Sequence, residues 1–125
     1  MRRIDWRDER GAAAVEFALI APVLFLLLFG TIEFGAMYNA QILVTSAARD
    51  AARTMAIDND TAAAKTAAIA AAPGIGLVAS EVTISAACAA GSTVTVTVAH
   101  PQHFMTGIFG ATITLDGKAT RRCNG

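Results

Sequence analysis

The longest apolar stretch of the chain lies close to its N-terminus. From Gly11 to Phe34 the sequence reads GAAAVEFALIAPVLFLLLFGTIEF, with formal charges only at Glu16 and Glu33. About 20 apolar residues are enough to cross a bilayer as a helix. The sequence therefore predicts a transmembrane helix over residues 12–38.

Beyond Glu33 the helical pattern becomes amphipathic and continues to about Ile57. Apolar residues recur every three or four positions and form one stripe, at Met37, Ala40, Val44, Ala47, Ala51 and Met55. On the other side, Asp50 and Arg53 are spaced to pair along the helix. Pro22 is the only breaker, and we expect it to kink the helix because proline donates no backbone hydrogen bond. A helix over residues 12–57 is roughly 70 Å long, so its second half must leave the membrane.

A second, short helix is predicted over residues 61–72. Asp60 or Thr61 is suited to cap its first turn, because a short side-chain oxygen accepts hydrogen bonds from the free backbone N–H groups there. Pro73 and Gly74 follow and end it. The helix is almost entirely alanine, so it buries little area per residue.

Within residues 77–122, three short runs alternate between apolar and hydroxyl side chains. The apolar positions are Val82, Ile84, Val94, Val96, Val98, Ile113 and Leu115, with threonine or serine between them. This period of two indicates strands with one buried and one wet face. Residues 89–91 link the first two strands at hairpin length. We expect an antiparallel sheet of about three strands, and hence an α+β fold.

The link from His100 to Gly110 is longer and contains a cluster of large apolar residues. These are Phe104, Met105, Ile108 and Phe109, which we expect to cap the core rather than to form an exposed contact patch. His100 and His103 flank Pro101, an arrangement expected at the surface. Their spacing does not resemble that of a zinc site, so no metal site is predicted.

Composition limits the function further. The chain has 125 residues, no net charge and 54% hydrophobic residues. Without its N-terminal 38 residues it is long enough for one small domain. The neutral charge argues against nucleic-acid binding. We find no phosphate-binding glycine loop and no catalytic triad spacing, so neither an enzyme nor a cofactor is expected.

Arginines at positions 2, 3, 7 and 10 precede the apolar stretch, and the next basic residue is Arg49. The positive-inside rule therefore places the N-terminus in the cytoplasm and residues 39–125 outside it. Cys88, at the end of the first strand, and Cys123, after the last, then share an oxidising compartment. We expect them to form a disulfide; the alternative is two unpaired buried thiols.

Glu16 needs a separate explanation, because a carboxylate in a membrane segment is costly. If the leader MRRIDWRDERG were cleaved after Gly11, Ala12 would become the N-terminus and Glu16 the fifth residue, followed by Phe17. This arrangement resembles the class III signal of type IV pilins. An ordinary secretory signal fits poorly, since the apolar stretch is too long and lacks a small-x-small cleavage site. An uncleaved anchor fits the length but leaves Glu16 unexplained.

The likeness continues downstream through IEFGAMYNAQ, TSAARDAAR and a C-terminal strand ending in RRC. Together these segments resemble the TadE-like branch of the Tad (tight adherence, type IVc) pilus system. The resemblance implies a minor pilin or pseudopilin, made as a single-pass inner-membrane precursor with a leader over residues 1–11. It implies cleavage by a prepilin peptidase, then a role in pilus assembly, priming or tip formation in adherence.

The resemblance also implies partners: other Tad pilins or pseudopilins, the inner-membrane assembly platform and the lipid bilayer. By the same resemblance, the new amine of Ala12 would be N-methylated and would lie near Glu16 of a neighbouring subunit. The alternative from another functional class is a single-pass anchored, extracytoplasmic binding or sensor domain.

Overall fold

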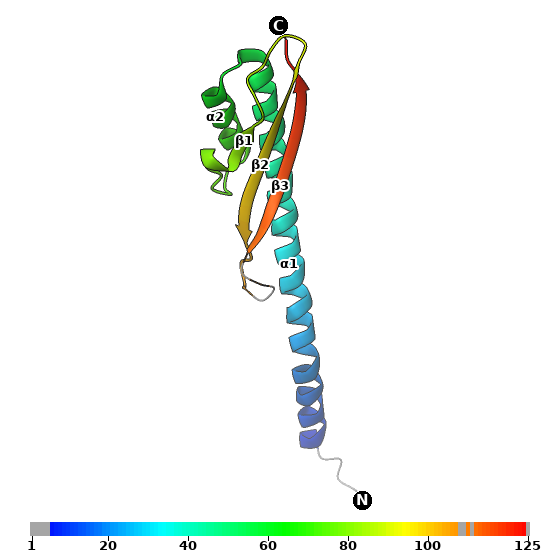
Figure 1. Cartoon of the computed structure of the whole chain (residues 1–125). Helices are drawn as coiled ribbons and strands as arrows, with labels where there is room; N and C mark the ends of the chain where they lie inside the picture. Colours follow the sequence, from blue (N-terminus) through cyan, green and yellow to red (C-terminus); the bar gives the residue numbers. More distant parts are fainter. Residues whose placement is uncertain (1–5, 108–109, 111, 125) are drawn as a thin grey trace, which may run out of the picture. The chain divides into compact units, whose positions relative to one another are not determined.

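The computed structural model describes residues 6–107, 110 and 112–124. In chain order its elements are helices α1 (Trp6–Asp58) and α2 (Thr61–Ala71), the short 3-10 helix η1 (Ala79–Glu81), and strands β1 (Val82–Ile84), β2 (Thr93–His103) and β3 (Thr112–Arg122) (Figure 1). This is the expected α+β fold. The chain divides into two compact units, Met1–Phe34 and Gly35–Gly125, which share α1 and are described separately.

In the first unit α1 begins at Trp6, earlier than the predicted start at Ala12. The last leader residues are therefore helical and continuous with the apolar stretch. The helix also continues through Pro22. Since proline has no N–H group, the carbonyl of Ala18 lacks its usual helical donor. The kink at Pro22 remains a prediction.

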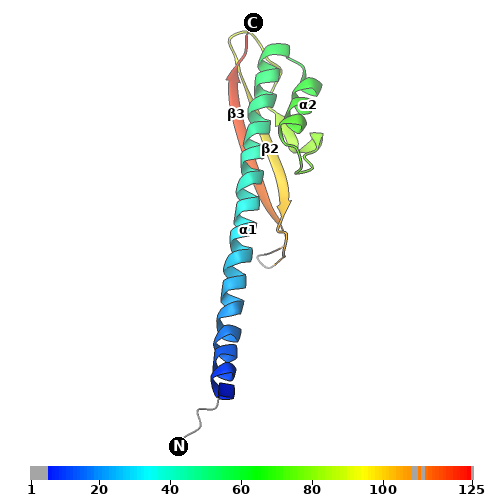
Figure 2. The ribbon, with the colours of Figure 1, turned by 180° about the vertical axis from the view of Figure 1, so that it is seen from behind.

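In the second unit the remainder of α1 lies along one face of the sheet (Figures 1 and 2). The predicted stripe forms this contact: Ala40, Val44, Ala47, Ala51 and Met55 are buried, and Met37 is half-buried. Ala64 and Ala68 of α2 also belong to the buried core. Because most of these residues are alanines, helix and sheet approach each other closely.

The sheet is antiparallel with strand order β1-β2-β3. β2 and β3 pair over their whole length, from Thr93 with Arg122 to His103 with Thr112. The short β1 covers only the middle of β2, so beyond it β2 is an edge strand. This explains how β2 continues through Pro101, since proline is tolerated at edges. Both long strands exceed the predicted alternating runs.

The hairpin predicted at residues 89–91 is wrong in its length. β1 ends at Ile84, so residues 85–92 form a longer connection, and Cys88 lies within it rather than at the end of a strand. A turn closes this connection, in which the N–H of Ser92 donates to the carbonyl of Ala89 (3.0 Å). Gly91 supplies the positive φ of 74° that the turn requires.

Two polar residues define the junction between the helices. Asn59 adopts a φ of 49°, and its N–H donates to the carbonyl of Met55 (3.1 Å), which ends α1. Asp60 then caps α2, accepting hydrogen bonds from the N–H groups of Ala62 (2.8 Å) and Ala63 (3.2 Å). The predicted cap at Asp60 is confirmed.

Three further predictions need correction. His100 is buried, not at the surface, because it continues the inward-facing positions of β2. Met105 is 75% exposed, so it does not cap the core, and Phe104 is half-buried. Ile108 and Phe109 lie outside the described residues. Within the described part of the chain, no ion pair joins Asp50 to Arg53.

The closest approach of sheet to helix is at Gly117 in β3. A Cβ atom at this position would lie 2.5 Å from the carbonyl oxygen of Val44 and 2.9 Å from its carbonyl carbon. Both atoms belong to the backbone of α1, which cannot rotate away. The position therefore accepts only glycine without a shift of helix or strand.

We expect Gly117→Ala to destabilise the second unit by about 1–3 kcal/mol, the usual range for overpacking a core. Hydrogen exchange of the β2 amides, measured on the full chain in micelles, reports this loss. Lys118→Ala is the control, because Lys118 is the exposed neighbour on the same strand. Equal protection of the β2 amides in the two variants would contradict the proposed contact.

Candidate functional site

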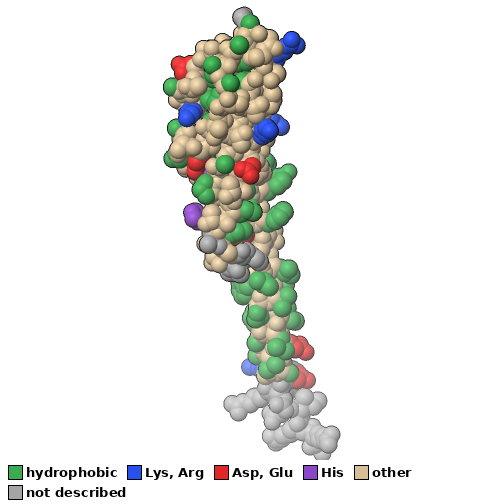
Figure 3. All heavy atoms as spheres, in the orientation of Figure 1, with side chains coloured by type: hydrophobic (Ala, Val, Ile, Leu, Met, Phe, Trp, Pro, Cys, Tyr) green, Lys and Arg blue, Asp and Glu red, His purple; other side chains and the backbone are tan. Residues whose placement is uncertain are grey.

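The surface of the first unit is apolar and exposed. The large apolar side chains from Val15 to Phe34 are 42–76% exposed. Among the described residues one helix is long and apolar enough to cross a membrane. Its most apolar 18-residue segment has a mean hydropathy of 2.5, and none of that segment is buried. The exposed apolar surface, green in Figure 3, indicates single-pass membrane anchoring.

The predicted cleavage and assembly residues lie on this helix. Gly11 is inside α1, and a Cβ atom added there would meet nothing within 4 Å. Glu16 is exposed and, within the described residues, forms no hydrogen bond or ion pair. It follows Ala12 by one helical turn, so the two residues share a face about 6 Å apart along the axis. The described residues therefore give Glu16 no structural role.

Phe17 is also directed outward, at 70% exposure. With residues of the next three turns it lines a shallow apolar hollow of about 230 Å³, made by Phe17, Ala21, Leu24, Phe25 and Leu28. Its lining residues come both before and after Pro22 in the sequence. This part of α1 thus presents a notched apolar surface rather than a smooth one.

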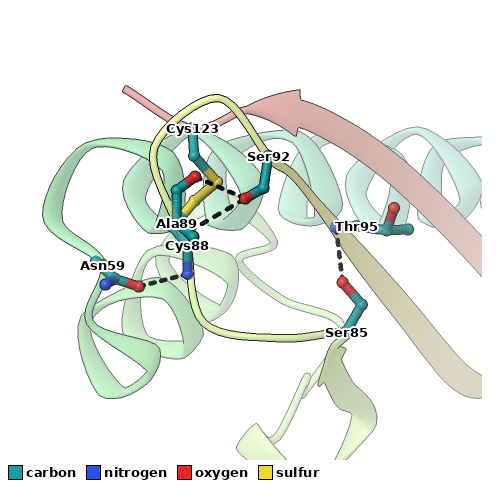
Figure 4. Close-up of a disulfide and its surroundings, with 7 residues drawn as sticks. All are labelled: Asn59, Ser85, Cys88, Ala89, Ser92, Thr95 and Cys123. Atoms are coloured by element: carbon teal, nitrogen blue, oxygen red, sulfur yellow. Dashed lines mark hydrogen bonds between the residues drawn. A yellow bond between two sulfur atoms is a disulfide. The ribbon is translucent and has the colours of Figure 1, made fainter. Parts of the chain in front are cut away.

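Cys88 and Cys123 are joined by a disulfide with a Cα–Cα distance of 5.5 Å (Figure 4). The bond connects the segment after β1 to the end of β3. Hydrogen bonds support both halves: the N–H of Cys88 donates to Oδ1 of Asn59 (2.7 Å), and the N–H of Cys123 donates to the carbonyl of Ser92 (2.9 Å). Asn59 therefore ends α1 and orients Cys88 at the same time.

In cells we expect neither cysteine to be free, given their predicted extracytoplasmic location. Thiol alkylation followed by mass spectrometry, without reductant, should label neither Cys88 nor Cys123.

The loop closed by the bond spans 35 residues. In the chain-entropy model such a bond contributes about 3–4 kcal/mol, so Cys123→Ser should unfold the second unit at markedly lower denaturant concentration. Full alkylation of the native protein would refute the bond.

The ion pair in the described part of the chain joins His100 of β2 to Glu81 of η1. Nδ1 of His100 lies 2.9 Å from Oε2 of Glu81, and the N–H of Val78 donates to the same oxygen at 3.1 Å. Burial raises the pKa of Glu81, but the hydrogen bonds from His100 and Val78 and the charge of His100 together bring this pKa below its ordinary value of 4.5. The pair fixes η1 against the sheet.

A carboxyl group whose pKa is lower in the folded than in the unfolded chain stabilises the fold at any pH above its unfolded-state pKa. This contribution is lost as the pH falls through the folded-state pKa. The part contributed by Glu81 should thus disappear below about pH 4.5. Glu81→Gln should cost roughly 1 kcal/mol at neutral pH and flatten the acid side of the stability profile. Asp50→Asn, at an exposed carboxylate, is the control. Identical profiles for Glu81→Gln and wild type would contradict this assignment.

Other candidate residues are not brought together. His103 is exposed, and its Nδ1 lies 3.1 Å from Oγ1 of Thr112. In the part of the chain that the structure describes, no group of three His, Cys, Asp or Glu residues could hold a metal ion. Glu33, which the sequence did not single out, is 2% exposed. Its buried position becomes apparent only from the folded chain.

Comparison with known proteins gives one finding. Residues 11–53 match the family model described as TadE-like protein. The match begins at Gly11, the residue before the predicted cleavage point, and includes the whole of IEFGAMYNAQ and TSAARDAAR. It ends before α2 and the sheet, so the C-terminal strand ending in RRC is not part of it.

Among curated proteins and among solved structures, no significant match is found. The family match therefore rests on α1 alone. A TadE-like segment on an exposed apolar helix points to a pilus component rather than to an enzyme. Over residues 11–53 the chain is thus similar to the TadE-like family, and this similarity points to a pilin-like protein associated with the Tad pilus.

Proposed function

We propose that the chain is a minor pilin or pseudopilin of a Tad pilus. It is inserted in the inner membrane with its N-terminus in the cytoplasm and residues 39–125 outside. A prepilin peptidase cleaves it after Gly11, and the mature subunit then serves in pilus assembly, in priming or at the tip. Its partners are the peptidase, other Tad pilins and the assembly platform.

One observation carries this proposal: a lone, exposed carboxylate on an otherwise apolar helical surface. Glu16 has no partner within the described residues of its own chain, although a carboxylate in lipid is expensive. A membrane protein keeps such a group when it is paired or functional. The family match over residues 11–53 is consistent with that role being in a pilus.

The partner that we propose for Glu16 is the Ala12 amine of a neighbouring subunit. Cleavage after Gly11 creates this amine one helical turn from Glu16. A small axial offset between two adjacent, parallel helices would then place the amine of one chain beside the carboxylate of the next. The pairing would neutralise two groups that are each costly in lipid.

N-terminal sequencing of the protein extracted from host membranes tests the processing step. An N-terminus at Ala12 supports the pilin assignment. An N-terminus at Met1 would instead support an uncleaved, anchored extracytoplasmic domain. The same preparation, analysed by mass spectrometry, shows whether the Ala12 amine carries a methyl group.

A further inference from the structure

Three arginines surround one hollow in the second unit, at the end that carries the last described residues. The hollow has a volume of about 450 Å³ and is lined by Arg53, Ala56, Ile57, Arg121, Arg122 and Asn124. We call it the basic hollow. Its volume falls within the range of ordinary ligand sites. In Figure 3 basic side chains appear in blue near this end of the domain.

The backbone of the hollow is firmly held. Arg121 and Arg122 end β3, in register with Val94 and Thr93 of β2. The next residue, Cys123, is fixed by the disulfide, and the N–H of Asn124 donates to the carbonyl of Ala56 in α1 (3.4 Å). Covalent and backbone bonds, not attraction between side chains, therefore bring these arginines next to α1.

The charges of the basic hollow are not compensated within the described residues. No described carboxylate lies within 4.0 Å of a guanidinium group of the hollow. The ion pair that the described residues form, between His100 and Glu81, does not involve the hollow. Asp50 and Asp58 line a neighbouring hollow together with Arg53, yet neither forms an ion pair with it. Three positive charges around one space repel each other, and a bound anion would relieve this repulsion.

We propose that the basic hollow binds a phosphate-bearing ligand. Guanidinium groups present planar pairs of N–H donors that match phosphate oxygens bidentately. A phosphate group with two charges and three free oxygens can use more than one such donor pair, whereas a single carboxylate offers two oxygens only. Ile57, which is 60% exposed, supplies an apolar wall beside the charges. This inference does not depend on the proposed pilus role.

Calorimetric titration of the full chain with inorganic pyrophosphate tests the proposal. The protein is held in nanodiscs of zwitterionic lipid, so that lipid headgroups add no net charge. We expect saturable binding that weakens as salt is added. The triple variant Arg53→Gln/Arg121→Gln/Arg122→Gln should lose at least about tenfold in affinity, since hydrogen bonds to charged groups are among the stronger ones.

Lys65→Gln/Lys118→Gln is the control, because it removes positive charges outside the hollow, those of the half-buried Lys65 and the exposed Lys118. It should retain wild-type affinity. An equal loss of pyrophosphate affinity in both variants would show that net charge alone causes the effect and would overturn the proposal. The absence of saturable binding would also overturn it. Citrate is the second ligand: citrate binding as tight as pyrophosphate would overturn the preference for phosphate. Retained hydrogen-exchange protection of β2 shows that each variant is folded.

Discussion

Gly11→Leu should leave the full-length precursor in the membrane. Gly11 lies inside α1, and a peptidase must draw the bond that follows it out of the helix. Glycine weakens a helix by about 1 kcal/mol relative to alanine, whereas leucine is a good helix former. A Cβ atom added at Gly11 meets no atom within 4 Å, so we expect the variant to fold normally. Mass spectrometry of the membrane fraction distinguishes precursor from mature protein.

Gly35→Leu is the matched control for this prediction. It is the same substitution in the same helix, again at a position where an added Cβ meets nothing within 4 Å. Because Gly35 is far along the chain from the cleavage site, this variant should mature as the wild type does. Maturation of Gly11→Leu to the wild-type mass would show that the assigned cleavage site is wrong.

Glu16→Ala should abolish recovery of the subunit with the pilus fraction while leaving the protein stable and cleaved. The substitution removes a charge from an apolar helix, so membrane insertion should be at least as good. Within the described residues Glu16 has no internal contact to lose. What disappears is the proposed pairing with the Ala12 amine of a neighbour, which leaves that amine unpaired in lipid at a cost of several kcal/mol.

Co-purification of tagged subunits with the pilus fraction measures this effect. Glu16→Gln separates charge from shape and should fail in the same way. Glu9→Ala is the control, because it removes an exposed carboxylate of the same helix that cleavage would discard. Equal recovery of wild type and Glu16→Ala would refute the proposed pairing and would favour the alternative of an uncleaved, membrane-anchored domain.

Hydrophobic periodicity was enough to predict two helices, three strands and the inward face of α1, although not every boundary. Spacings of three and four place Val44 and Met55 on one side of a helix whatever they pack against, and both are buried. The alternation in β2 likewise extends from Val98 to His100. That continuing period of two was the signal that could have identified His100 as buried, but the proline that follows suggested a loop instead.

Long-range contacts were the part that the sequence could not supply. The approach of Gly117 to Val44, and the pairing of Glu81 with His100, join segments whose spacing along the chain carries no information about their distance in space. The same holds for Arg53 beside Arg121 at the basic hollow. Local sequence patterns determine the secondary-structure elements and their buried faces. The register in which the elements pair determines which residues come into contact.

The contact between Gly117 and Val44 also bears on how related sequences can vary. Because a Cβ at position 117 would meet the backbone of α1 as well as the Val44 side chain, no substitution at position 44 makes enough room for it. Homologues with this packing should therefore keep glycine at 117 even where residue 44 changes. Where another residue occurs at 117, the compensating change should be an insertion, a deletion or a β-bulge in β3, and alignments of relatives would reveal it as a gap rather than as a correlated pair.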